Sequence, residues 1–224
     1  FLLLQKLGYS WAKNCHHLSY GMVELPEGKM KSREGTVVDA DDMMEEMVQS
    51  AKAITAELGK LEGLDEAQKD ELHEIIGLAA LKYFLLKVDP VKNMLFDPVE
   101  SIDFNGHTGP FIQYTHARIR SVLRNFDTPP RIADVPADIN PSERRILIRL
   151  HRFPQVILDS ADAYDPSGLA NYLYELVKEF NAFYQSISIM RADTEAEKMF
   201  RATLASTVGQ VVKRGMALLG MEVP

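Results

Sequence analysis

Apolar residues recur at every third or fourth position over most of this chain, and this repeat limits the fold more than any other feature of the sequence. Such spacing places the apolar side chains on one face of an α-helix, and that face must pack against other elements. Four stretches carry such a stripe: residues 44–58, 72–86, 111–126 and 169–187. We therefore expect helices from Asp39 onward and an all-helical bundle in the second half of the chain.

Several helix ends can also be placed from the sequence. Residues 140–143 read Asn-Pro-Ser-Glu, which provides a capping side chain, a proline in the first turn and a glutamate at the third position. Residues 194–197 read Thr-Glu-Ala-Glu and fit a capping box, and Gly220 provides a stop for the last helix. Pro154 predicts an interruption or a kink in the helix that starts near Pro141, because proline has no backbone N–H to donate.

The first 38 residues show a different pattern, rich in glycine and without helical spacing, and we expect no helix there. Residues 17–23 alternate as a strand would, and residues 36–38 are a second short strand candidate. Residues 88–109 look irregular because prolines and glycines interrupt them. The sequence thus predicts a mainly α protein with a small α/β part in front, divided into domains at residues 1–97 and 98–224.

Charge and cysteine content restrict the functional classes. The net charge of −7 argues against general nucleic-acid binding, yet residues 116–152 contain eight arginines and no lysine. Arginine suits phosphate pairing and stacking on bases, although a solvated helix face explains the same stretch equally well. Cys15 is the single cysteine, so we expect neither a disulfide framework nor a zinc site, and a cytoplasmic location. No apolar run is long enough to cross a membrane.

A cationic loop is the first candidate for chemistry. It spans residues 28–35, bracketed by two glycines, and we call it the lysine loop; its candidate positions are Lys29, Met30, Lys31, Ser32 and Arg33. Ammonium and guanidinium groups on such a loop can neutralise charge that develops on a leaving polyphosphate. An ordinary basic surface turn is the alternative.

The residues of the lysine loop resemble the KMSKS signature of class I aminoacyl-tRNA synthetases, in the variant typical of arginyl-tRNA synthetases. Further runs resemble the same family in the same order along essentially the whole chain. These runs are residues 17–23, 83–86, 109–119, 172–176, 180–184 and 218–224. The resemblance implies a remnant of a Rossmann-type catalytic domain in residues 1–97 and a helical, DALR-type anticodon-binding domain in residues 98–224.

The resemblance also implies a reaction and roles for the loop. Arginine and ATP, with Mg²⁺, would form arginyl-adenylate and pyrophosphate, and the arginyl group would pass to its tRNA. Lys29 would stabilise the pyrophosphate side of the transition state, Met30 and Ser32 would shape the loop, and Lys31 and Arg33 would be helpers. The usual second lysine of the signature falls at Ser32, so its charge has to come from elsewhere.

The other class I signature, His-x-Gly-His, is absent from the sequence, and the arginine pocket belongs to the same missing region. We therefore expect this chain by itself to be inactive and to bind neither ATP nor arginine. Phe1 is not a start methionine, which suggests a piece of a longer gene product. We expect no metal site in it.

The helix that starts near Pro110 is the candidate RNA-binding element. It offers groups for stacking, hydrogen bonding and phosphate pairing: Gln113, Tyr114, Arg118, Arg120 and Arg124. Unpaired anticodon bases are bound by such groups. The three arginines cannot all share one helix face, and Tyr114 could instead be partly buried. A second candidate set is Arg144, Arg145, Arg149 and Arg152; His116 is more typical of a structural histidine.

Three functions fit the sequence. The first is the C-terminal part of an arginine–tRNA ligase, expected to be a monomer, with the tRNA for arginine as its partner. The alternative is a free-standing helical module that binds tRNA or other RNA without catalysis. The third is a helical scaffold that binds no RNA; it predicts no salt-dependent RNA affinity. The lysine loop favours the first, because a binding module has no need of it.

Overall fold

The N-terminal part of the chain forms only short elements. The computed structural model describes residues 1–25, 39–58, 63–131, 136 and 138–224. Its first elements are the helix α1 (Leu2–Lys6), a 3₁₀ helix η1 (Ser10–Asn14) and the strand β1 (Val23–Glu24). The prediction of no helix in residues 1–38 is therefore wrong at α1 and η1, which are short, isolated turns that carry no amphipathic repeat.

Of the predicted strand at residues 17–23, only Val23 lies in a strand, the two-residue β1. Val23 pairs with Met94 and Glu24 with Leu95, so that β1 and β2 (Met94–Leu95) form a parallel pair. Just before β1, the N–H of Gly21 donates to the Pro90 carbonyl instead, which ends the ladder. The second strand candidate, residues 36–38, lies outside the described residues. Parallel neighbours need a crossover, and the two long helices between them supply it.

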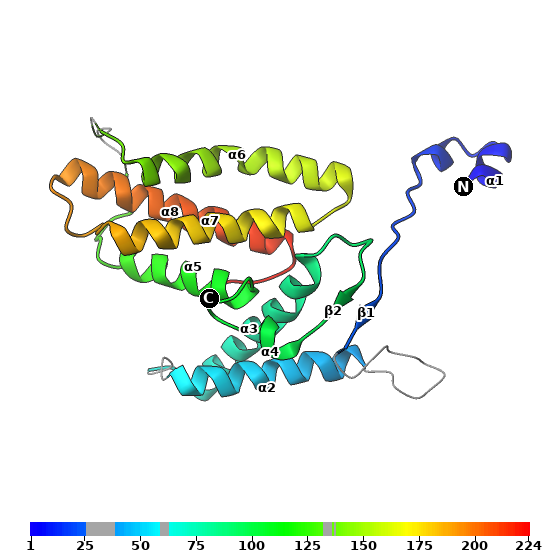
Figure 1. Ribbon diagram of the computed structural model, residues 1–224, viewed down its shortest axis with the longest axis horizontal. Helices are drawn as coiled ribbons and strands as arrows, with labels where there is room; N and C mark the ends of the chain where they lie inside the picture. Colours follow the sequence, from blue (N-terminus) through cyan, green and yellow to red (C-terminus); the bar gives the residue numbers. More distant parts are fainter. Residues whose placement is uncertain (26–38, 59–62, 132–135, 137) are drawn as a thin grey trace.

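These two helices, α2 (Ala40–Leu58) and α3 (Glu66–Leu86), pack closely against each other (Figure 1). Asp65 caps α3, since its carboxylate accepts from the Gln68 N–H at 2.8 Å. The contact needs a glycine, because a Cβ at Gly77 would lie 2.8 Å from the Met47 backbone. Around this contact lies the smaller of two apolar cores. Its buried members are Met47, Ala51, Ile76, Ala80, Leu81, Phe84, Phe96 and Ile102.

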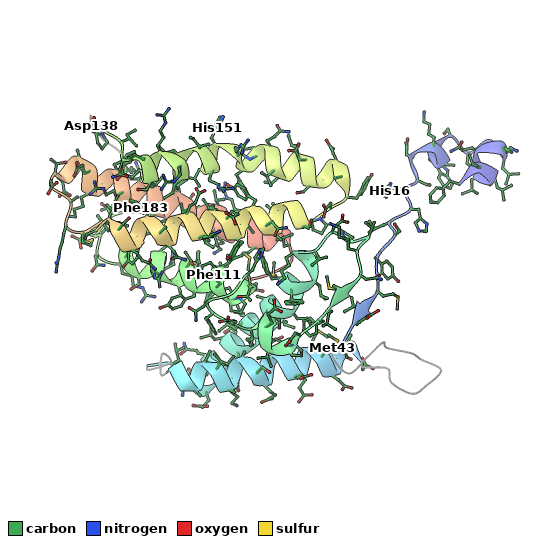
Figure 2. All side chains as sticks on the ribbon, viewed as in Figure 1. His16, Met43, Phe111, Asp138, His151 and Phe183 are labelled. Atoms are coloured by element: carbon green, nitrogen blue, oxygen red, sulfur yellow. The ribbon has the colours of Figure 1, made fainter. Side chains whose placement is uncertain are left out.

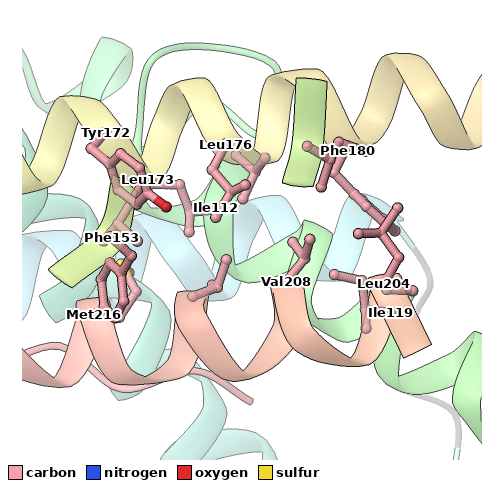
Figure 3. Close-up of a cluster of buried hydrophobic side chains, with 14 of the residues drawn as sticks. Ile112, Ile119, Phe153, Tyr172, Leu173, Leu176, Phe180, Leu204, Val208 and Met216 are labelled. Carbon is pink, nitrogen blue, oxygen red and sulfur yellow. The ribbon is translucent and has the colours of Figure 1, made fainter. Parts of the chain in front are cut away.

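The remaining helices form a bundle around the larger core. After the short α4 (Pro98–Ser101) come four long helices: α5 (Gly109–Leu123), α6 (Pro141–Ala163), α7 (Ser167–Ser186) and α8 (Glu195–Leu218). In Figure 1, α5 and α6 lie on opposite sides of the layer made by α7 and α8. Their apolar stripes meet in the middle, where Leu173, Leu176 and Phe180 of α7 are fully buried (Figure 3). The predicted stripe of residues 169–187 is confirmed as core.

The helix ends follow the predictions with two exceptions. Asn140 and Glu143 make both bonds of a capping box at the start of α6. At α8, Thr194 accepts from the Glu197 N–H, but the Glu197 carboxylate bonds to the Asp193 N–H, so the capping box is only half formed. Of the interruption or kink predicted at Pro154, the interruption does not occur, since α6 continues to Ala163. Pro154 is exposed. Water can therefore donate a hydrogen bond to the carbonyl four residues earlier, which receives none from the proline.

A buried ion pair joins α6 to α8. The Glu143 side chain is only 3% exposed, and its Oε1 accepts from Nε of Arg201 at 2.7 Å. Its other oxygen, Oε2, accepts from the Asn140 N–H at 2.8 Å as part of the capping box. Glu143 is thus both a cap for α6 and the anchor of Arg201.

The helix α3 belongs to both cores. Ala79 and Tyr83 are buried in the larger core, and the Tyr83 hydroxyl donates to the Ala170 carbonyl of α7 at 2.9 Å. Burial raises the pKa of Tyr83, which keeps this hydroxyl a donor. A Cβ at Gly109 would lie 2.5 Å from the Ala79 carbonyl oxygen, so α5 begins in direct contact with α3. The domain division at residue 98 remains a prediction, and the bundle core extends across it.

None of the helices in the described part of the chain is both long and apolar enough to cross a membrane.

The protonation state of three histidines affects the stability of the fold. Burial lowers the pKa of each below its ordinary value of 6.5: His73, His107 and His116. For His73 in α3, Lys52 adds to this effect and Asp70 opposes it. Both ring nitrogens of His73 are buried without a hydrogen-bond partner.

We expect the free energy of unfolding to fall as the pH drops below about 6.5. The folded chain keeps these imidazoles neutral, whereas the unfolded chain takes up protons there, so stability is full above that pH and is lost below it. Each histidine adds at most about 1.4 kcal/mol per pH unit to the slope. Urea denaturation between about pH 7.5 and 5.5 measures this slope. His73→Leu should flatten it, and the exposed His151→Gln should not; equal slopes for wild type and His73→Leu contradict the prediction.

Candidate nucleic-acid interface

The lysine loop lies outside the described residues, and so do the candidate positions Lys29, Met30, Lys31, Ser32 and Arg33. Within the described ranges, no group of three or more His, Cys, Asp or Glu side chains could hold a metal ion. The candidate site that the structure does describe is on α5 and the elements around it.

The position of α5 is fixed at its first turn. Thr108 caps the helix, with its Oγ1 accepting from the Phe111 N–H at 3.3 Å. Ile112 and Ile119 then point into the larger core and are fully buried. Tyr114 and Arg118, four residues apart, share a face that lies beside this core, and both are half-buried. The packing of α5 therefore places these two side chains next to each other.

The Arg118 guanidinium lies between two aromatic rings. Its central carbon is 4.8 Å from the ring centre of Tyr114 and 5.5 Å from that of Tyr184 on α7. Its Nη1 donates to Oδ1 of Asn181, also on α7, at 2.6 Å. Guanidinium groups are attracted to aromatic faces and stack on them as planar groups. The arrangement is a layered cluster of two tyrosines and one arginine at the junction of α5 and α7.

Asn181 holds Arg118 in this orientation. Its amide nitrogen donates to Oγ1 of Thr115 at 2.9 Å, and the Thr115 hydroxyl donates to the Phe111 carbonyl at 3.0 Å. Asn181 is buried, and the chain of bonds ties the guanidinium to the α5 backbone. The cluster is therefore preorganised before any ligand arrives.

Two cavities border this cluster, and Tyr114 and Arg118 line both. The first, which we call the tyrosine pocket, has a volume of about 630 Å³ and extends from α5 and α7 to α2 and α3. Tyr114, Arg118, Tyr184, Ile76 and Pro224 are among its lining residues. The second, which we call the amide pocket, has a volume of about 440 Å³. It is lined by Phe104, Asn105, Phe111, Tyr114, Arg118, Lys178, Asn181, Ala182 and Gln185.

Gln113 faces inward. Its side chain is buried, and its Nε2 donates to the Ile75 carbonyl at 3.1 Å and to the Glu222 carbonyl at 2.8 Å. Lys82 of α3 donates to the Gly220 carbonyl at 2.7 Å in the same region. Gln113 thus holds the last residues against α3 and α5, and it also lines the tyrosine pocket.

His116 also contacts the last residues. Its Nδ1 lies 2.9 Å from the Pro224 carbonyl oxygen, and the ring is buried. Burial lowers the pKa of His116, and the hydrogen bond to Pro224 opposes that effect. A neutral ring that donates from Nδ1 fits this geometry, as expected for a structural histidine.

Two arginines of the predicted set point to solvent. Arg120 and Arg124, at the end of α5, are exposed, and within the described part of the chain neither has an ion-pair partner. Arg118, in contrast, is built into the cluster. The structure therefore brings Tyr114 and Arg118 together with Tyr184, and leaves Arg120 and Arg124 at the surface nearby.

Comparison with known proteins identifies the family. Residues 112–224 match the family model described as "DALR anticodon binding domain", which covers half of the chain. Residues 1–98 match the model described as "tRNA synthetases class I (R), catalytic domain". The chain belongs to the arginyl-tRNA synthetase family. This confirms the resemblance drawn from the sequence motifs.

The relatives agree with this arginyl-tRNA synthetase assignment. The arginine–tRNA ligase of Phocaeicola vulgatus is 55% identical over the whole chain, and that of Bacteroides thetaiotaomicron is 56% identical. The chain spans 38% of the length of each. The structure of the Thermus thermophilus arginyl-tRNA synthetase matches 99% of this chain and 37% of its own, with a TM-score of 0.86 and 29% identity. The Plasmodium falciparum arginyl-tRNA synthetase shares the fold at a TM-score of 0.74 and 22% identity.

The second arginine set is on α6, away from the cluster. Arg144, Arg145 and Arg152 are exposed, whereas Arg149 pairs with Glu179 of α7 at 2.9 Å. Figure 2 shows His151 of the same helix on the outer side of the bundle, far from Phe111 of α5. The two arginine sets therefore do not form one surface.

Several residues of the cluster and the pockets were missed by the sequence analysis. Tyr184 and Asn181 of α7, Phe104 and Pro224 were not singled out as site residues. For α7 a signal existed, because Phe180 and Phe183 define its buried face and place Asn181 and Tyr184 at the border of that face. For Phe104 and Pro224 we find none, since both reach the site only through tertiary packing.

Proposed function

We propose that this chain is the tRNA-binding part of an arginine–tRNA ligase and that it holds the anticodon arm of the tRNA for arginine. The observation that carries the proposal is the guanidinium of Arg118 between the rings of Tyr114 and Tyr184, beside a cavity. Single-stranded bases are bound by stacking on aromatic and guanidinium planes, each stacked base contributing about 1–3 kcal/mol. The membership of residues 112–224 in an anticodon-binding family supports the same assignment.

In this proposal, one unpaired base enters the tyrosine pocket and stacks on the cluster. Arg120 and Arg124, which are exposed on the same helix, pair with phosphates of the loop. Gln113 and His116 hold the last residues in the pocket wall. Gln113 also lines this pocket, where it would contact the base.

The whole protein would join arginine to its tRNA at the expense of ATP. Arginine and ATP, assisted by Mg²⁺, give arginyl-adenylate and pyrophosphate, and the arginyl group then passes to the 3′ end of the tRNA. Lys29 would stabilise the leaving pyrophosphate, with Met30 and Ser32 shaping the loop and Lys31 and Arg33 as helpers. The match of residues 1–98 to a class I catalytic domain supports these roles. ATP and arginine would bind only together with the catalytic region that this chain does not span.

The same match makes a free-standing RNA-binding module the less favoured interpretation, because such a module has no need of a catalytic-domain segment. We propose a monomer that works in the cytoplasm. The single cysteine, Cys15, supports a reducing compartment.

Binding of the purified chain to the tRNA for arginine tests the proposal. The comparison RNAs are the same tRNA with an altered anticodon loop and a tRNA for another amino acid, each over a series of salt concentrations. We expect the intact tRNA to bind about 10-fold tighter or more, with affinity that falls as salt rises because phosphates are neutralised. Salt-dependent but equal binding of all three favours a general RNA-binding module, and no binding by the folded chain favours the scaffold.

A further inference from the structure

We propose that His16 and Tyr164 form a contact, which we call the latch, that ties the segment leading into the lysine loop to the helical bundle. Tyr164 would thereby be a positioning residue for the reaction. The proposal rests on the proposed function and deepens it, because the latch joins the two parts of the chain that match different family models. It is carried by three observations: an aromatic stack, a strained backbone and a second anchor of the same segment.

The stack joins residues that are far apart in the sequence. The rings of His16 and Tyr164 have their centres 4.3 Å apart and their planes 9° apart, which is a parallel stack (Figure 2). His16 belongs to the N-terminal segment, and Tyr164 is the residue at which α6 ends. Both side chains are exposed, so burial in a core does not impose this contact. Aromatic pairs attract each other beyond the area that they bury.

The backbone at Tyr164 is strained. Its φ of 53° lies in the left-handed region, and among the described residues it is the only one other than glycine with a positive φ. The Tyr164 N–H donates to the Ala161 carbonyl at 3.1 Å. The Asp165 N–H donates to the Ser160 carbonyl at 3.0 Å, which completes a Schellman motif. Glycine is the usual residue at this position, so a tyrosine held there points to a function of its ring.

A second anchor holds the same segment beyond the stack. The Gly21 N–H donates to the Pro90 carbonyl at 2.7 Å, and the Met22 N–H donates to Oδ1 of Asn93 at 2.8 Å. The chain between His16 and Gly21 is therefore held at both ends. The lysine loop follows this segment in the sequence, shortly after β1.

The latch connects the site on α5 and α7 to the segment before the lysine loop. The helix α7 begins at Ser167, shortly after Tyr164, and carries Asn181 and Tyr184 of the cluster. Loss of the Tyr164 ring would release His16 without removing any residue of the cluster or of the cores. Because a misplacement of about 1 Å can lower a catalytic rate by about 100-fold, a released segment should slow the reaction.

The first test uses the chain itself and its single tryptophan, Trp11, which belongs to the same N-terminal segment. We expect Tyr164→Ala to lower the fluorescence anisotropy of Trp11, and Tyr164→Phe to leave it unchanged because phenylalanine can still stack on His16. Leu158→Ala removes another exposed side chain from α6 and is the matched control, with no expected effect. Combining His16→Ala with Tyr164→Ala should lower the anisotropy no further than either substitution alone.

The second test measures the strain by thermal unfolding. In the His16→Ala background, where the tyrosine ring has lost its partner, Tyr164→Gly should raise the Tm of the chain by about 2–4 °C, because glycine adopts the left-handed conformation freely. In the wild-type background the gain should be smaller, since the same substitution also removes the stack. Equal gains in both backgrounds contradict the latch.

The third test uses the full-length ligase with the same substitutions. We expect Tyr164→Ala to lower kcat for arginylation about 5- to 50-fold, to change the KM for tRNA less than about 2-fold, and Tyr164→Phe to restore kcat. An unchanged Trp11 anisotropy, or a wild-type kcat in Tyr164→Ala, overturns the inference alone. A wild-type ligase that attaches no arginine overturns the proposed function, and the positioning role with it.

Discussion

Replacing Arg201 with methionine will destabilise the chain by about 3 kcal/mol, within the range of about 3–5 kcal/mol found when one partner of a buried ion pair is removed. The substitution leaves the Glu143 carboxylate, only 3% exposed, with one remaining bond from the Asn140 N–H. A buried charge without its partner carries most of its desolvation cost uncompensated. Urea denaturation of both proteins at neutral pH measures the difference.

Two further variants separate the ion pair from simple loss of packing. Combining Arg201→Met with Glu143→Gln removes the charge but keeps a side-chain acceptor for the Asn140 N–H, and should restore most of the stability. Lys198→Met breaks a partly exposed pair with Glu195 on the same helix and should cost less than about 1 kcal/mol. A loss below about 1 kcal/mol for Arg201→Met alone contradicts the prediction.

Arg118→Leu will lower the affinity of the chain for arginine tRNA by about 10- to 100-fold. The substitution removes the guanidinium plane between Tyr114 and Tyr184 and its bond to Asn181. Loss of one stacking and charged interaction with RNA costs about 1–3 kcal/mol. Arg118→Lys keeps the charge but not the plane, so we expect an intermediate loss. Equilibrium binding at one fixed salt concentration measures all three proteins, with thermal unfolding to confirm that each is folded.

Arg120→Leu and Arg124→Leu are the matched controls for this prediction, since both arginines are exposed on the same helix. Each should lower affinity only about 2- to 5-fold and equally for all RNAs, while the salt slope falls by about 0.7 for each phosphate that the variant no longer neutralises. The role given to Arg118 is wrong if Arg118→Leu behaves like these two. RNA would then be held by surface charge alone.

The helical part of the fold could be predicted from the sequence because helix formation depends on residues that are close together along the chain. The stripe of residues 169–187 and the Asn140–Glu143 capping box are confirmed, since spacing and capping depend on neighbours along the chain. Residues 1–38 were harder, because α1 and η1 are too short to show a repeat. The continuation of α6 through Pro154 could not be foreseen, because the cost of a proline depends on solvent exposure, which the sequence does not reveal.

The site was predictable only in part. The proximity of Tyr114 and Arg118 could be predicted, because side chains four residues apart on a helix lie next to each other. The hydrogen bonds from Gln113 to the carbonyls of Ile75 and Glu222 could not be foreseen, because both partners are distant in the sequence. The contact of Gln113 with RNA remains a prediction. Tyr184, Phe104 and Pro224 come from other parts of the chain, and only the packing of α5 against α7, α3 and the last residues brings them together. The residues of the lysine loop remain a prediction.

The helix α3 contributes residues to both apolar cores, and this determines where the chain can be cut into separately folding parts. The family boundary near residue 98 assigns α3 to the catalytic side, yet Ala79 and Tyr83 complete the core of the bundle. A truncated protein that begins at residue 98 would leave the Ala170 carbonyl and the start of α5 uncovered, whereas one that begins before Asp65 keeps the capped helix. We therefore expect the bundle to fold as an independent unit only when the helix that precedes it is included.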